Sequence, residues 1–298
     1  MTDAFLALLA CPRCGAAFTA AGDTLGCTGC AATFPIIAGI PRLNDGAVER
    51  DARIAAEYEA QAHAHALYID DRSVMNRLEA QVLPRLIEWL GDADGPILDL
   101  GCGVGYFGRA WQRHGRPDVP LIGMDLQVKL IADADVGYAG RLEGDVHRLP
   151  MRDGSVGAVV FANALHHVSD PVVALEQVRR VLAPGGVVVA YDPREIGVIE
   201  VAKKVLRRKH DAFTEYHRAF KPDEYRSLFE RAGLHLERFA TVDPIGPLVG
   251  TALDMLHAGR LGVAAPAARL LARVDELTTR LDPTGALGLM VLAQARRV

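Results

Sequence analysis

One short segment restricts the possible folds of this 298-residue chain more than any other. Ile97–Leu100 is predicted to form a β-strand, a glycine-rich turn follows it at once, and a helix opens at Tyr106. Glycines in such a turn let a ligand approach the backbone closely, and free N–H groups at the start of the helix attract polar ligand groups. The segment therefore predicts an α/β fold with a nucleotide cofactor bound at the turn.

Two classes of cofactor fit this turn. The dinucleotide pattern G-x-G-x-x-G begins at Gly103, and the S-adenosylmethionine (SAM) pattern D-x-G-x-G-x-G begins at Asp99. Asp125, at the end of a predicted strand over 120–124, suits the ribose hydroxyls of either cofactor. The turn and Asp125 together leave open both an NAD-dependent oxidoreductase and a SAM-binding enzyme.

Three further sequence blocks follow the turn. They are Gly-Asp-Val-His-Arg-Leu-Pro at 144–150, Asn-Ala-Leu-His-His-Val-x-Asp-Pro at 163–171 and Arg-Val-Leu-Ala-Pro-Gly-Gly at 180–186. With the turn, they make residues 74–192 resemble class I SAM-dependent methyltransferases, in particular the UbiE-like group (methyltransferase type 11). The resemblance implies a Rossmann-like α/β sheet of seven mostly parallel strands with an antiparallel last strand. It also implies SAM as the cofactor and transfer of its methyl group to an acceptor.

The resemblance assigns roles around the cofactor. Asp99 is expected to orient the turn or to meet the amino group of the cofactor through water, and Asp125 to bind the ribose hydroxyls. Asp145 is expected at the adenine edge and Asn163 beside the reacting methyl. Tyr58 stands where related enzymes fold a helix over the cofactor, although a helix-packing tyrosine is an equal interpretation. The predicted cofactor-binding residues are Tyr58, Asp99, Gly101, Cys102, Gly103, Gly105, Asp125, Leu126, Asp145, Val146, Asn163 and Ala164.

Four of the five cysteines form a separate pattern near the N-terminus. Two Cys-x-x-Cys pairs with twelve residues between them point four thiolates at one centre, which predicts a closed, structural Zn²⁺ site. A redox or iron–sulfur role is less favoured. The pairs and the tail Phe-Pro-Ile…Gly-Ile-Pro-Arg-Leu, which ends at Leu43, resemble the Trm112-like zinc ribbon, a partner or fused accessory of methyltransferases. The predicted ligands are Cys11, Cys14, Cys27 and Cys30.

These patterns predict three regions. Residues 1–43 form the four-cysteine ribbon, residues 44–93 a helical linker or cap, and residues 94–298 the SAM-binding domain. Helical inserts are expected near 194–217 and 247–281, the second as two amphipathic helices that cover the acceptor pocket or form a homodimer contact. No run of about 18 apolar residues occurs, and the segment before Cys11 is too short for an export signal, so a cytoplasmic protein is expected.

The acceptor is less well defined by the sequence. Lys and Arg number 33 against 37 Asp and Glu, a net charge of −4, which favours a small-molecule or lipid-like acceptor over nucleic acid. Basic residues over Lys203–Lys209 keep an rRNA or tRNA methyltransferase as an alternative, and a non-catalytic docking module is a further one. A general base is needed only if the acceptor must lose a proton, and His166, His167 and His217 are weak candidates.

Overall fold

The computed structural model describes residues 1–45, 72–134, 136–197 and 218–298. Tyr58, His217 and the basic stretch Lys203–Lys209 lie outside the described residues, so the expectations for them stay predictions. Within the described ranges, no helix is long and apolar enough to cross a membrane.

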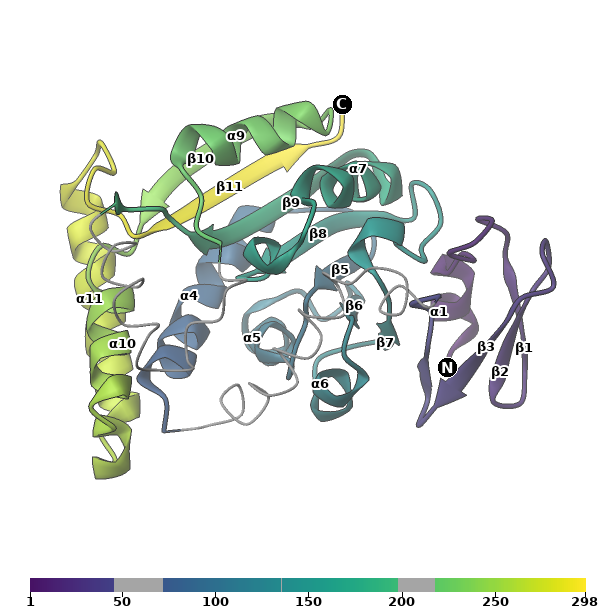
Figure 1. Cartoon of the computed structure of the whole chain (residues 1–298), viewed down its shortest axis with the longest axis horizontal. Helices are drawn as coiled ribbons and strands as arrows, with labels where there is room; N and C mark the ends of the chain where they lie inside the picture. The colour runs from purple at the N-terminus through teal and green to yellow at the C-terminus, as the bar shows by residue number, and fades with distance from the viewer. Residues whose placement is uncertain (46–71, 135, 198–217) are drawn as a thin grey trace.

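A seven-stranded sheet forms the centre of the molecule (Figure 1). Its strand order is β10-β11-β9-β8-β5-β6-β7, in which the strands from β9 to β7 are parallel and β11 runs antiparallel to both neighbours. This arrangement confirms the predicted α/β fold class with its antiparallel last strand. The strands are β5 (Ile97–Leu100), β6 (Leu121–Asp125), β7 (Gly140–Glu143), β8 (Val156–Ala162), β9 (Leu182–Pro193), β10 (His235–Val242) and β11 (Met290–Arg296).

Helices cover both faces of the sheet, and its central strands are therefore apolar along most of their length. One face packs against α7 and α9 through side chains such as Leu175 and Tyr225, and the other against α4 and α5 through Leu86 and Phe107. Asp170 starts α7 by accepting hydrogen bonds from two backbone N–H groups of the first turn. The helices are α4 (Val74–Leu90), α5 (Tyr106–His114), α6 (Val128–Asp133), α7 (Pro171–Val181) and α9 (Pro222–Arg231), with short turns η1 (Val146–Arg148) and η2 (Leu165–His167).

The N-terminal segment forms a small antiparallel sheet at one end of the molecule (Figure 1). It adjoins the edge strand β7, where Arg42 pairs with Glu143 and the N–H of Leu43 donates to the carbonyl of Glu143 at 2.8 Å. Phe5 and Leu25 belong to the same apolar cluster as residues of the large sheet, so the ribbon packs on that sheet through a shared core. The elements are α1 (Asp3–Leu8), β1 (Phe18–Ala21), β2 (Thr24–Cys27), β3 (Thr33–Ile37) and β4 (Ile40–Pro41).

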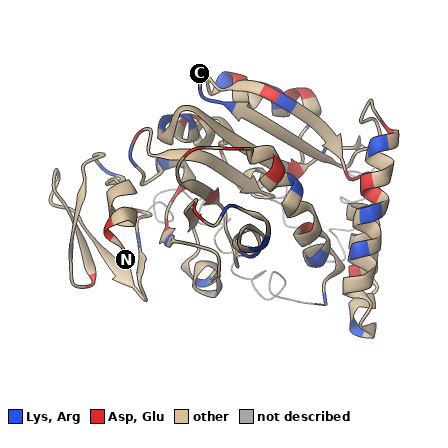
Figure 2. Cartoon of the chain, turned by 180° about the vertical axis from the view of Figure 1, so that it is seen from behind, with Lys and Arg blue, Asp and Glu red and all other residues tan. Residues whose placement is uncertain are grey.

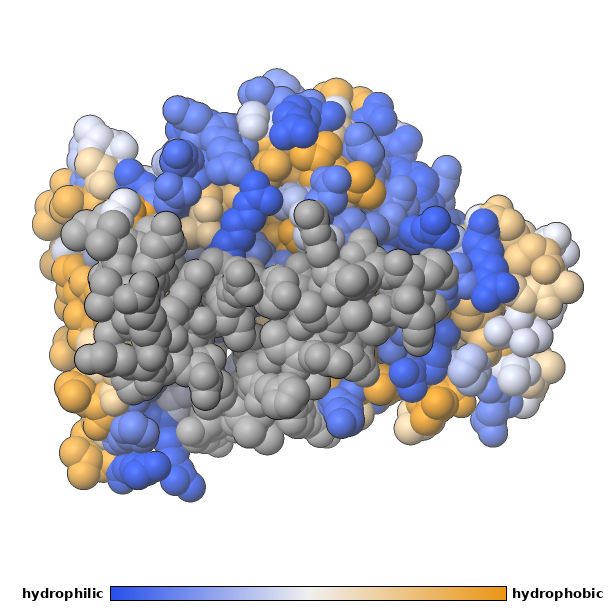
Figure 3. Space-filling model, in the orientation of Figure 1, coloured by the Kyte–Doolittle hydropathy of each residue, from blue (hydrophilic) through white to orange (hydrophobic). Residues whose placement is uncertain are grey.

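Two helices fill the long connection between β10 and β11, where the sequence predicts amphipathic helices. α10 (Gly246–Met255) and α11 (Ala264–Leu281), joined by η3 (Ala258–Leu261), pack on α4 around Val74 and Leu78. Asp254 of α10 also caps α4, because its carboxylate accepts the N–H of Val74 at 2.6 Å. Figure 3 shows apolar side chains at the edge of the molecule that these helices form, and Figure 2 shows arginines along α11. A cover for the acceptor pocket or a homodimer contact stays a prediction for this insert.

Candidate functional site

The glycine-rich turn between β5 and α5 has a backbone that only glycine adopts easily. Gly101, Gly103 and Gly105 have φ angles of 74°, 50° and 85°, in the left-handed region that disfavours other residues. A Cβ atom on Gly101 would lie 2.5 Å from the Cβ of Ala164, so the turn packs closely against the segment that follows β8. The sequence pattern therefore has a steric cause in this structure.

Asp125 fixes the turn from the end of β6. Its carboxylate accepts the N–H of Gly103 and the N–H of Gln127, each at 2.9 Å. Burial raises the pKa of Asp125 above its ordinary value, against the effect of these hydrogen bonds. Cys102, in the same turn, is buried, and burial raises the pKa of its thiol well above the usual range, as expected of a packing residue.

Asp99 lies directly before the turn and is fully buried. Its Oδ2 accepts the hydroxyl of Tyr138 at 2.6 Å, and the Tyr138 oxygen accepts the N–H of Gly108 at 3.1 Å. Burial raises the pKa of Asp99 to about 7. Among the described residues its Oδ1 has no hydrogen-bond partner, so one buried acceptor oxygen stays available beside the turn. Sequence reasoning missed Tyr138, which lies between two predicted strands and in no motif.

Tyr138→Phe is expected to lower the free energy of unfolding by roughly 2 kcal/mol at pH 8 and by less at pH 6. The folded-state pKa of Asp99, about 7, is above its ordinary value of 3.8, so Asp99 lowers the stability increasingly from about pH 4 to pH 7, and above pH 7 its carboxylate is ionised in the folded chain as well. Removing the phenol donor leaves that carboxylate more poorly stabilised at pH 8, whereas the protonated acid at pH 6 needs the donor less. Urea unfolding at both pH values measures the difference.

The control for this prediction is the same substitution made in an Asp99→Asn background. There the loss caused by Tyr138→Phe should be equal at pH 6 and pH 8, because the amide does not titrate. An equal loss at both pH values in the wild-type background would contradict the assigned pairing of Tyr138 with Asp99.

The other predicted cofactor residues lie at the same carboxyl edge of the sheet. Asp145 follows β7, and its Oδ1 accepts the N–H of His147 at 2.9 Å and lies 2.7 Å from the Nδ1 atom of His147. Burial tends to raise the pKa of Asp145, but the hydrogen bonds from His147 outweigh it and lower that pKa. Leu126 and Val146 are half-buried beside these strand ends. The structure thus brings these predicted residues together, and their contacts with a cofactor stay predictions.

Asn163 directly follows β8 and has a strained backbone conformation. Its φ is 64°, which is uncommon outside glycine, and its N–H donates to the carbonyl of Tyr191 at 3.0 Å. The side-chain Nδ2 donates to Oε1 of Glu79 at 2.7 Å, whereas the buried Oδ1 has no partner among the residues that the structure describes. Burial raises the pKa of Glu79 to about 7. Sequence reasoning missed Glu79, since it lies on α4 in a stretch without a motif.

His166 of the histidine pair is held in a buried network, and His167 is half-buried beside it. His166 is 3% exposed, and its Nδ1 lies 2.9 Å from Oδ1 of Asp192. The Tyr225 hydroxyl donates to Oδ2 of Asp192 at 2.6 Å, and burial raises the pKa of Asp192 to about 7. The ring of His167 lies 3.8 Å from that of His166, centroid to centroid. These contacts favour a packing role for the pair, and a role as general base stays a prediction.

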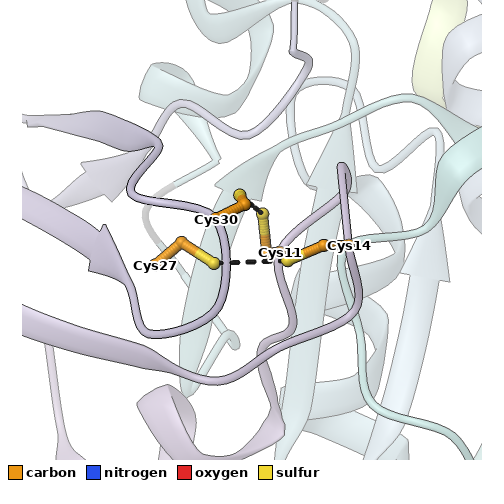
Figure 4. A group of neighbouring side chains, drawn as sticks. All are labelled: Cys11, Cys14, Cys27 and Cys30. Atoms are coloured by element: carbon orange, nitrogen blue, oxygen red, sulfur yellow. Dashed lines mark hydrogen bonds between the residues drawn. The ribbon is translucent and has the colours of Figure 1, made fainter.

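The four predicted metal ligands converge at the ribbon (Figure 4). Their four sulfur atoms all lie within 4.8 Å of one another, with Cys14 and Cys27 at 3.4 Å and Cys11 and Cys30 at 3.7 Å. Burial disfavours the thiolate of Cys27, but hydrogen bonds from backbone N–H groups outweigh it and lower its pKa to about 6. Four converging sulfurs can hold a tetrahedral metal ion.

Comparison with known proteins identifies the region that carries the turn. Residues 98–190 match the family model described as a methyltransferase domain. Malonyl-[acyl-carrier protein] O-methyltransferase of Pectobacterium atrosepticum is 34% identical over 94 residues, which are 31% of this chain and 36% of that protein. Probable tRNA methyltransferase 9B of Mus musculus is 28% identical over 142 residues, 46% of this chain and 30% of that protein. The chain spans less than half the length of the first curated relatives that it matches.

A solved structure shares the fold over more of the chain. It is a chain from a complex that contains the Haloferax volcanii Trm112 methyltransferase activator, with a TM-score of 0.53 and 20% identity. The match covers 81% of this chain and 96% of that chain, and at this identity it shows the fold alone. Residues 98–190 of the present chain match a methyltransferase domain, which agrees with the resemblance to SAM-dependent methyltransferases that the sequence blocks carry.

Proposed function

We propose that the chain transfers a methyl group from SAM to an acceptor. The observation that carries this proposal is a pair of buried acceptor oxygens, Oδ1 of Asp99 and Oδ1 of Asn163, which lack partners among the described residues. They belong to the two segments that meet at Gly101, and such oxygens suit the charged amino group of the methionine portion of SAM. SAM itself supplies the activated methyl, and the protein aligns the acceptor with it in a water-poor site.

The remaining residues of the edge fit the other parts of SAM. Asp125 at the end of β6 suits the ribose hydroxyls, and Asp145 with Leu126 suits the adenine. A dinucleotide fits the turn less well, because its diphosphate would lie beside the buried carboxylate of Asp99, which forms no ion pair with a Lys or Arg of the described ranges. This argument favours SAM over NAD as the cofactor of this chain.

The acceptor that we propose is a small molecule or a lipid-like compound. The net charge of −4 and the UbiE-like sequence blocks support it. By their names, one of the two relatives above acts on malonyl-[acyl-carrier protein] and the other on tRNA. An RNA acceptor is therefore the second candidate, through the basic stretch Lys203–Lys209. We also propose that the four cysteines hold a structural Zn²⁺, which the spacing of their sulfur atoms supports.

The test of the cofactor is a calorimetric titration of the full chain with SAM, S-adenosylhomocysteine (SAH) and NAD(H). Micromolar binding of SAM and SAH is expected, and Asp125→Asn should weaken both by at least tenfold, because the amide replaces a carboxylate that accepts charge-assisted hydrogen bonds. Asp118→Asn, at an exposed aspartate outside the site, is the matched control and should bind as the wild type does. Binding of NAD(H) alone would overturn the proposal.

A further inference from the structure

Glu79 places a carboxylate at the end of β8 that no sequence motif indicates. It reaches from α4 to the side chain of Asn163, where Oε1 accepts Nδ2 at 2.7 Å. Its second oxygen, Oε2, makes no hydrogen bond with the residues that the structure describes. The carboxylate of Glu79 therefore uses one oxygen for the hydrogen bond with Asn163, and its other oxygen is free to contact a ligand.

The charged and titratable neighbours of Glu79 do not compensate its charge. Tyr191 faces it from β9, but the Tyr191 hydroxyl donates to Oδ2 of Asp243 at 2.8 Å. Asp243, after β10, is in turn paired with Arg85 of α4 at 2.9 Å. No Lys or Arg within the described part of the chain forms an ion pair with Glu79. Glu79 is half-buried, and a carboxylate there without a cationic partner, at the carboxyl edge of the sheet, is a candidate functional group.

The backbone brings this carboxylate close to the glycine turn. Asn163 adopts its left-handed φ of 64°, and the next residue, Ala164, packs against Gly101. Strain of this kind persists where the surrounding structure requires it, often at ligand sites. The strained backbone at Asn163 holds this residue beside the place expected for the reacting methyl. The hydrogen bond from Asn163 holds the Glu79 carboxylate at the same place.

We propose that Glu79 faces the transferred methyl and accepts the proton of an acceptor that carries a hydroxyl or amine group. This inference rests on the proposed function. In the step, a lone pair of the acceptor oxygen or nitrogen forms the bond to the methyl carbon, and the electrons of the carbon–sulfur bond pass to sulfur, which loses its positive charge. The acceptor proton goes to the Glu79 carboxylate, so charge and atoms balance.

Two further features agree with this assignment. Burial raises the pKa of Glu79 to about 7, which matches a group that must take up and release a proton near neutral pH. A carboxylate acceptor has no proton to lose and would be repelled by the ionised Glu79, so the inference narrows the acceptor to neutral hydroxyl or amine compounds. His166, held against the buried Asp192, is not needed as the base.

The test needs no acceptor and uses SAM and SAH as probes. The sulfur of SAM is positively charged and that of SAH is neutral. The ratio of the affinity for SAM to the affinity for SAH therefore reports the electrostatic potential at the site of the methyl group. In the wild type, the ratio should shift toward SAM by roughly tenfold between pH 6 and pH 8, as Glu79 ionises. Glu79→Gln should remove most of that shift, because its amide does not titrate. The binding is measured by calorimetry on the full chain.

A matched control lies on the same helix. Glu88 is exposed on α4, and Glu88→Gln should keep the wild-type ratio at both pH values. Thermal melting of each variant checks folding, and Glu79→Asp, which keeps the charge, should recover part of the pH shift. If SAM and SAH bind but Glu79→Gln keeps the wild-type pH shift, the inference about Glu79 is wrong. If neither compound binds to the wild type, the proposed function itself fails.

Discussion

Replacing Cys14 by serine is expected to release the metal ion and to lower the melting temperature of the whole chain by about 10 °C or more. The Cys14 side chain is exposed, so the same substitution would have little effect if the thiol had no ligand role. In a structural zinc site, however, the binding free energy is folding free energy. Because Cys11 and Phe34 belong to the apolar cluster that continues into the large sheet, loss of the ribbon exposes part of the domain core.

Two measurements check this expectation. Metal content by mass spectrometry should fall from one ion per chain to near zero, and the wild type in chelator should melt close to the Cys14→Ser variant. Cys102→Ala, at a buried cysteine outside the cluster, is the control and should keep its metal ion. A Cys14→Ser variant that retains the ion and the wild-type melting temperature would contradict the proposed zinc site.

The effect should also reach the cofactor turn. Ile40 of β4 packs with Cys102 of the turn and Ile131 of α6 in one small apolar cluster. Unfolding of the ribbon removes Ile40 from this cluster and loosens the turn that Asp125 holds. We therefore expect the affinity of the metal-free chain for SAH to fall by about tenfold, comparable to the loss of one well-packed contact.

The features predicted correctly from sequence are those with local causes. The strand, turn and helix around Gly101 follow one another in the chain, and the positive φ angles require glycine whatever surrounds them. The spacing of the cysteine pairs likewise predicts that their sulfur atoms converge, because each Cys-x-x-Cys segment forms a local turn. The seven-stranded sheet was predicted from the family resemblance, which rests on short sequence blocks of this local kind. The structure has that sheet.

What sequence did not reveal depends on distant contacts. Tyr138 is 39 residues from Asp99 and Glu79 is 84 residues from Asn163, and nothing in the local pattern marks either as a partner. The histidine pair shows the converse. Its block indicates a position near the site, but only the packing around Asp192 shows that His166 is buried and hydrogen-bonded.

The junction between the ribbon and the large sheet is the most distant of these contacts and supports the second large prediction. Arg42→Ala is expected to destabilise the chain by about 3 kcal/mol or more, because it leaves the Glu143 carboxylate buried without a cation. Glu143 is 1% exposed, and its Oε1 accepts Nη2 of Arg42 at 2.9 Å and Nδ2 of Asn44 at 3.0 Å. Chemical unfolding measures the loss.

A double-mutant cycle separates the pair from its surroundings. Glu143→Leu alone leaves Arg42 half-buried without its partner, and the double variant Arg42→Leu/Glu143→Leu should cost less than the sum of the single changes. Additive losses would contradict a direct coupling between these residues. Since Glu143 ends β7 directly before Gly144 and Asp145, the Arg42→Ala variant should also bind SAH more weakly. A single unfolding transition in the wild type and two in Arg42→Ala would mean that this ion pair joins the ribbon to the domain as one cooperative unit.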